Sequence, residues 1–144
     1  MKDVIKAKEL LKDEITMVLV KDDNVIDSKE NGIKPLLNLI DSNIFLNGYS
    51  IADKIVGKAQ AMLIVKAKIS EVYAKTISKQ AENILNRYNI PYTYDNLTDV
   101  IINRDKTDIC PMEKAVKDID DIDKAYIALK NTVKRMMGDE LNGK

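Results

Sequence analysis

The sequence predicts a single α/β domain. Its 144 residues match the usual length of one domain, roughly 100–200 residues. Stretches rich in β-branched residues alternate along the chain with stretches whose apolar residues recur at helical spacing. The first two strand-like stretches lie close enough together to form a β-hairpin that opens the sheet. We therefore expect one domain over residues 1–137 and a disordered tail over residues 138–144.

The N-terminal third supplies a helix, the hairpin and a second helix. Residues 3–12 place apolar side chains among charged ones, which is typical of a short amphipathic helix. Ile15–Val20 and Val25–Ile26 are the two strands, and residues 21–24 form the turn between them. Pro35 suits the first turn of the helix that follows.

A central, buried helix is predicted to begin near Ser50. Ser50 and Asp53 have the spacing of a capping box, with Asp in place of the usual Glu or Gln. Apolar residues then recur at helical intervals through Leu63. Gly57 lies inside this predicted helix and is interpreted as a packing glycine, because glycine in a helix costs about 1 kcal/mol relative to alanine.

The C-terminal half continues the alternation. Ile69–Ile77 is a predicted strand, and Ser78 can cap the helix after it. Tyr92–Tyr94 is a further short strand, whereas residues 96–109 fit a strand or a helix equally well. Cys110-Pro111 begins another helix, and a last helix follows a junction that contains the aspartates Asp118, Asp120, Asp121 and Asp123. We interpret these aspartates as helix caps rather than as a calcium site, because they lack the glycine and terminal glutamate of a calcium loop.

Composition excludes several classes of function. Lys and Arg together number 23, as do Asp and Glu, so the net charge is zero and gives no electrostatic reason to bind nucleic acid. The N-terminus becomes charged at once and lacks the apolar segment of a signal peptide. No apolar run approaches the length of a membrane span. We expect a cytoplasmic protein with neither a membrane nor a nucleic-acid partner.

The absence of histidine bears most directly on chemistry. Histidine is the commonest general base near neutral pH and the commonest metal ligand, and the chain has none. Cys110 is the only cysteine, so one chain cannot build a multi-cysteine metal site. We therefore expect no metal, no cofactor, no Ser-His-Asp relay and no catalytic zinc site.

Three motifs carry a resemblance to a known family. They are Gly32-Ile33-Lys34-Pro35-Leu36, Asp53-Lys54-Ile55-Val56-Gly57-Lys58-Ala59 and Cys110-Pro111-Met112-Glu113-Lys114. Together with the order of elements, they resemble an uncharacterised prokaryotic family that is a divergent branch of the cytidine deaminase-like fold. The resemblance spans roughly residues 5–130. It implies a three-layer α-β-α sandwich whose mixed central sheet begins with the β-hairpin.

The resemblance also implies that deaminase chemistry has been lost. Working members of that superfamily carry a His-x-Glu or Cys-x-Glu motif at one helix start and Pro-Cys-x-x-Cys at the next, which hold zinc and a proton-shuttling glutamate. The matching helix starts in this chain are residues 50–53 and 76–79, and neither contains a ligand set. Cys110-Pro111 reverses the Pro-Cys order and lies later in the chain. We expect a zinc-free, non-catalytic relative.

A phosphate-binding site is the first functional hypothesis. Two helices that start side by side at the edge of a parallel sheet present free backbone N–H groups to an anion. A nucleotide or other phosphate-bearing small molecule is the expected ligand. The candidate residues are Asp53, Lys54, Lys58, Ser78, Lys79 and Arg104. The alternative is that Ser50, Asp53 and Ser78 are ordinary caps, that the lysines form a solvated face, and that Arg104 belongs to a plain turn over residues 103–105.

Two further hypotheses stay open. Cys110 at a helix start is a weak candidate for a catalytic or redox-sensing thiol, because a helix dipole favours the thiolate. The nearby Glu113 opposes that effect by charge repulsion. Alternatively, an exposed face of the last helix, carrying Met136 and Met137, forms a homodimer.

Overall fold

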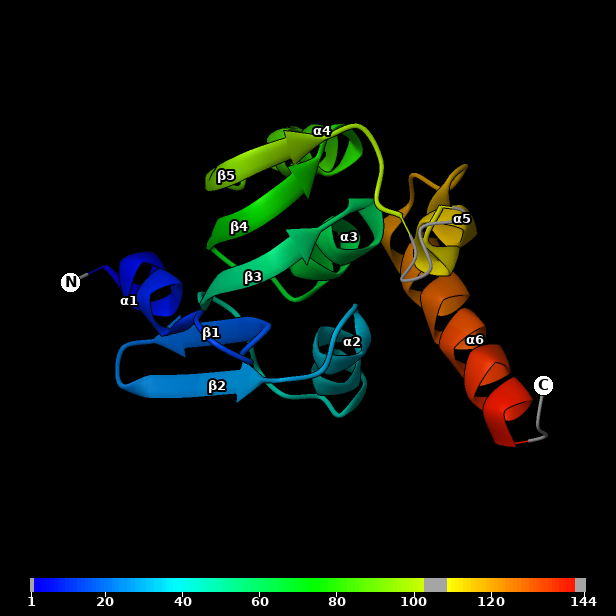
Figure 1. Ribbon diagram of the computed structural model, residues 1–144, viewed down its shortest axis with the longest axis horizontal. Coiled ribbons are helices and arrows are strands. Elements are labelled where there is room, and N and C mark those ends of the chain that lie inside the picture. The colour runs from blue at the N-terminus through cyan, green and yellow to red at the C-terminus, as the bar shows by residue number, and fades with distance from the viewer. Residues whose placement is uncertain (1, 103–108, 142–144) are drawn as a thin grey trace.

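The protein is built around a five-stranded sheet with helices on both faces (Figure 1). A computed structural model describes residues 2–102 and 109–141, the last three by their backbone only. The strands are β1 (Met17–Lys21), β2 (Asn24–Ser28), β3 (Ser50–Val56), β4 (Glu71–Ser78) and β5 (Tyr92–Thr98). The helices are α1 (Asp3–Leu10), α2 (Lys34–Asp41), α3 (Lys58–Lys66), α4 (Lys79–Arg87), α5 (Pro111–Val116) and α6 (Ile122–Leu141).

The sheet is mixed and has the strand order β2-β1-β3-β4-β5. The hairpin strand β1 runs antiparallel to both of its neighbours, and Met17 of β1 lies opposite Asp53 of β3. β3, β4 and β5 are parallel, and Ala74 of β4 lies on the other side of Asp53. The predicted α/β fold with a mixed sheet and an opening hairpin is therefore confirmed. Its assignment to the cytidine deaminase-like fold stays a prediction.

Alternating residues of the strands send their side chains into two separate cores. Val18, Ala52 and Tyr73 pack under Val4 and Ala7 of α1 on one face. The larger core, on the opposite face, joins the strands to α2, α3 and α4 and continues to α5 and α6. Figure 1 shows α1 apart from the other helices, at the N-terminal side of the sheet. The helices and the sheet form three layers because both faces of the sheet are apolar.

The prediction that a helix begins near Ser50 is wrong. Ser50–Val56 is strand β3, and the helix begins eight residues later, at Lys58. β3 is the central strand, and its first four residues are all buried, so an alternation of apolar and polar residues is missing. Without that alternation, periodicity alone does not separate a buried strand from a segment of buried helix. Ser50 and Asp53 consequently form no capping box, and they do not mark a helix start.

Gly57 occupies the turn between β3 and α3 rather than the interior of a helix. It is the N-cap residue of α3 and has ordinary extended backbone angles. A β-carbon placed on it would lie 2.2 Å from Oε1 of Glu113 and 2.8 Å from Cγ1 of Ile101. The position therefore requires glycine for space, because α5 and the chain before it approach the backbone too closely for a side chain.

Most of the other predicted elements are confirmed. Both hairpin strands, the helix at Pro35, the strand before Ser78, the strand at Tyr92 and the helix after Cys110 are present. Asp121 caps α6, since its carboxylate accepts a hydrogen bond of 2.9 Å from the backbone N–H of Lys124. The predicted turn at residues 103–105 lies outside the described residues, as do residues 142–144 of the expected tail. The backbone of α6 extends three residues past Gly138.

Across the described ranges, no helix combines the length and the apolar composition needed to cross a membrane.

The cap of α4 yields a first prediction. The hydroxyl of Ser78 accepts a hydrogen bond of 3.1 Å from the backbone N–H of Ala81, and Ser78 is fully buried. Ser78→Ala leaves that N–H without its partner and should lower the free energy of unfolding by about 0.5–2 kcal/mol in a urea titration. Ser70→Ala is the control, because the hydroxyl of Ser70 bonds to backbone at an exposed position and its loss should change stability by less than about 0.5 kcal/mol. Equal stability of the two variants would contradict the cap.

The crowding at Gly57 yields a second prediction. Gly57→Ala should destabilise the protein by about 1–3 kcal/mol, because Glu113 and Ile101 must both move. Gly138→Ala is the matched control, since a β-carbon there meets nothing within 4 Å and alanine is favoured in a helix by about 1 kcal/mol. Chemical denaturation should therefore shift the two midpoints in opposite directions. A Gly57→Ala variant as stable as the unmodified protein would show that α5 does not press on this turn.

Candidate functional site

The first candidate site is the edge where the parallel strands end. In α/β sheets, ligands commonly bind outside the carboxyl ends of the strands. β3 and β4 are parallel neighbours, so α3 and α4, which follow them directly, start at this same edge. The expectation of two helices that start side by side is met, although the first starts at Lys58 and not near Ser50. Figure 1 shows α5 beside the end of β3.

The start of α3 is already occupied by a carboxylate of the chain itself. The backbone N–H groups of Lys58 and Ala59 donate hydrogen bonds of 2.8 Å each to the two oxygens of Glu113. Glu113 comes from α5 and is buried. Burial raises the pKa of Glu113, while these two N–H groups and the charge of Lys58 act to lower it. The helix dipole and its free donors are thus satisfied internally, in the place where an external phosphate was expected.

Lys58 contributes to the same attachment of α5. Its side chain is only 9% exposed, and its ammonium donates to the backbone carbonyl of Lys117 at 3.2 Å. The carboxylate of Asp120 lies 3.8 Å from the same ammonium. The interpretation of this lysine as part of a solvated face is therefore wrong. Lys58 ties the first turn of α3 to the chain that follows α5.

Asp53 lies beneath the first turn of α3. It is buried in β3, and the side-chain amide of Gln60 donates to its Oδ2 at 2.6 Å. Desolvation raises the pKa of Asp53 to about 7, against opposing hydrogen bonds from Gln60 and from the backbone. The amide oxygen of Gln60, Oε1, is buried and has no hydrogen-bond partner among the residues placed by the structure. Asp53 is therefore a buried acid enclosed within the protein and not a surface ligand.

The remaining predicted ligand residues do not converge on one point. Ser78 caps α4, and Lys79 forms an exposed ion pair of 2.9 Å with Asp99. The ion pair raises the pKa of Lys79. Lys54 lies on β3 and donates to the backbone of Asp13, in the connection between α1 and β1. Arg104 lies outside the described residues.

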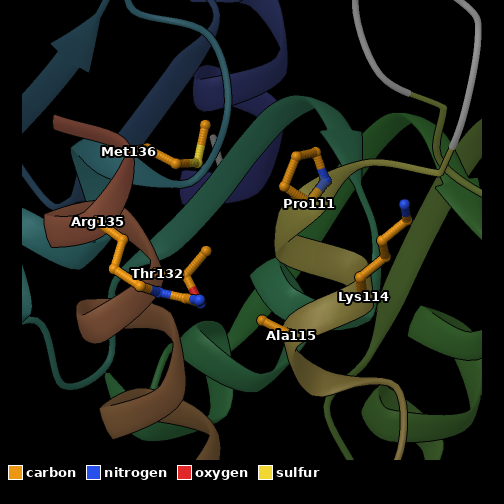
Figure 2. A pocket seen from close by; sticks show the side chains of 6 residues that line it. All are labelled: Pro111, Lys114, Ala115, Thr132, Arg135 and Met136. Atoms are coloured by element: carbon orange, nitrogen blue, oxygen red, sulfur yellow. The ribbon is translucent and has the colours of Figure 1, made fainter. Parts of the chain in front are cut away.

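A groove between α5 and α6 is the second candidate site. It has a volume of about 440 Å³ and is lined by Pro111, Lys114, Ala115, Thr132, Arg135 and Met136. Pro111, Lys114 and Ala115 come from α5, and Thr132, Arg135 and Met136 come from α6 (Figure 2). The guanidinium of Arg135 donates to the hydroxyl of Thr132 at 3.2 Å, and that hydroxyl donates in turn to the carbonyl of Ala128. Sequence patterns did not indicate this groove, because it forms only where two helices meet.

Neither the thiol hypothesis nor the dimer hypothesis is tested by this geometry. Cys110 is half-buried at the N-cap of α5, as predicted, and its side chain makes no capping hydrogen bond. Met136 and Met137 are exposed, and Met136 also lines the groove. Among the side chains that the structure describes, no group of three acidic or cysteine residues could hold a metal ion.

A family model and a solved structure both relate this chain to one family. No curated protein matches the chain. The chain is similar to a solved structure of a DUF1893 family protein, TM1506 from Thermotoga maritima, with 27% sequence identity and a TM-score of 0.78. That match covers 94% of this chain and 91% of the other. Residues 5–133 match the model of the family described as TM1506, a domain of unknown function (DUF1893). The chain therefore belongs to the TM1506 (DUF1893) family.

Proposed function

We propose that this domain is a zinc-free, non-catalytic relative of the deaminase-like fold that binds a nucleotide or other phosphate-bearing small molecule in the groove between α5 and α6. The observation that carries the proposal is the placement of Arg135. Its guanidinium lies in this groove, its recorded polar partner is the neutral hydroxyl of Thr132, and it pairs with no carboxylate among the described side chains.

The groove residues suit a ligand that has an anionic group and an apolar part. A guanidinium presents several N–H donors in one plane and binds phosphate or carboxylate through two parallel hydrogen bonds. Pro111, Ala115 and Met136 provide apolar walls on both helices. A volume of about 440 Å³ falls within the range of roughly 300–1,000 Å³ that is common for small-molecule sites.

The groove is a better candidate than the helix starts on which the sequence prediction rested. The donors at the start of α3 are bound to Glu113, so a phosphate would have to displace a buried carboxylate. At the start of α4, the hydroxyl of Ser78 already accepts from Ala81, and the cation of Lys79 is paired with Asp99. Arg135 requires no such displacement.

The chain lacks the side chains that a catalytic zinc site requires. A catalytic zinc needs three protein ligands and an open position for water. The sequence has no histidine and one cysteine, and the two helix starts carry Gly57-Lys58 and Ser78-Lys79. Glycine, lysine and serine are not usual zinc ligands, and the single thiolate of Cys110 cannot supply a set of three.

Binding is tested by titrating the full chain with a panel of nucleotides and inorganic phosphate, by calorimetry and thermal denaturation. A ligand of this class should raise the melting temperature, by the equivalent of about 2.7 kcal/mol at a concentration of 100 times Kd. Arg135→Gln should weaken its binding about 10- to 100-fold, because a hydrogen bond to a charged group contributes roughly 1.5–3 kcal/mol.

Arg87→Gln is the matched control. Arg87 is exposed on α4, is not among the residues that line the groove, and lies 3.9 Å from Asp120. Its substitution removes the same charge and should leave the affinity unchanged. The proposal fails if no member of the panel raises the melting temperature, or if the two variants lose affinity equally.

A further inference from the structure

The buried pair of Asp53 and Gln60, outside the proposed ligand site, combines one short hydrogen bond with one unpartnered amide oxygen. Asp53 is 6% exposed and Gln60 is 2% exposed, so water reaches neither side chain freely. The contact between the Gln60 nitrogen and Oδ2 of Asp53 is 2.6 Å. That distance is shorter than most N–H···O hydrogen bonds, which cluster near 2.9–3.0 Å. The Gln60 oxygen, in contrast, receives no hydrogen bond from any residue within the described ranges.

An ionised Asp53 leaves this arrangement incomplete. A carboxylate has no proton to donate, so it cannot satisfy the Gln60 oxygen. A neutral carboxylic acid has one O–H donor and one carbonyl acceptor, which match the carbonyl and N–H₂ of a primary amide. An acid and an amide can therefore form two hydrogen bonds in a ring. One proton on Asp53 would remove both the buried charge and the unpaired oxygen.

Among the residues that the structure describes, the groups around Asp53 offer no positive charge that would hold it ionised. Its strand neighbours are Met17 of β1 and Ala74 of β4, which are both apolar. On α3, the charge of Lys58 is directed to Asp120 and to the carbonyl of Lys117. Glu113 of α5 is itself an anion and binds backbone N–H groups. The ammonium of Lys54 bonds to the connection after α1.

We infer that Asp53 is held as a neutral acid that donates its proton to the Gln60 amide, so that the pair forms a latch between β3 and the first turn of α3 which ionisation opens. The latch holds the same turn of α3 that binds Glu113. Its opening loosens the attachment of α5, which forms one wall of the groove. The Asp53–Gln60 latch belongs to the scaffold and requires no bound ligand.

The raised pKa of Asp53, about 7 against an ordinary 3.8, sets the direction of the pH dependence. Between these two values the folded chain retains a proton that the unfolded chain has released. The folded state then binds more protons, so the contribution of Asp53 to stability is fully present below about pH 4. It is lost as the pH rises through about 7.

Asp53→Asn tests the latch, because asparagine reproduces the neutral acid: its N–H₂ donates to the Gln60 oxygen and its carbonyl accepts. The variant should have a higher melting temperature than the unmodified protein at about pH 8, and the difference should vanish by about pH 4. A variant that is less stable than the unmodified protein at about pH 8 overturns the inference, as does a difference that does not change with pH.

Asp41→Asn is the matched control. Asp41 is bound by Lys130 and Tyr126, which lower its pKa. Its contribution to stability is therefore present above its unfolded pKa and is lost in acid. This variant should be less stable than the unmodified protein at about pH 8, which is the opposite direction.

A measurement on the unmodified chain keeps the inference testable if the Asp53 variant does not fold. With ¹³C in the aspartate carboxyl groups alone, nuclear magnetic resonance follows each aspartate through its titration and leaves Glu113 silent. We expect one aspartate to titrate near pH 7, with faster hydrogen exchange at the backbone N–H groups of Lys58 and Ala59 above that midpoint. The inference is wrong if every aspartate titrates below about pH 5.

Discussion

The hydrogen bonds from the first turn of α3 to Glu113 are the contact on which the arrangement of this edge of the protein depends. They connect α3, which follows the central strand, to α5, a helix that begins more than fifty residues later in the chain. They explain why position 57 must be glycine, since the carboxylate fills the space of a side chain. They also set α5 against α6, and thereby form the walls of the groove. An internal anion thus neutralises the helix start.

The two buried carboxyl groups at this turn are held by different means. Glu113 receives two backbone N–H donors and the nearby charge of Lys58, which compensate for part of its desolvation. Asp53 lies on the central strand β3, and its side-chain partner is the amide of Gln60. Desolvation consequently dominates at Asp53 and moves its pKa to about 7. A proton is the simplest means by which such a group loses its charge.

The residues that suggested a family also prove to be residues that touch. The second motif contains Gly57, Lys58 and Ala59, and the third contains Glu113, and these four meet at the start of α3. The motifs were thus informative about position. Two of the predicted phosphate ligands, Asp53 and Lys58, are buried in the chain itself, and their role as ligands stays a prediction. The carboxylate of Glu113 occupies the position that an external anion would take at this helix start.

The sequence by itself determined the α/β class, the opening hairpin, the cap at Ser78 and the exclusion of histidine-based chemistry. These follow from local spacing and composition. Only the tertiary structure decided that Ser50–Val56 is a strand, because burial on both faces removes the alternation that marks one. Only the tertiary structure shows that Glu113 binds the backbone of Lys58 and Ala59. It also shows that Thr132 and Arg135 line one groove together with residues of α5. Such contacts depend on the packing of elements distant in sequence, and no local pattern encodes that packing.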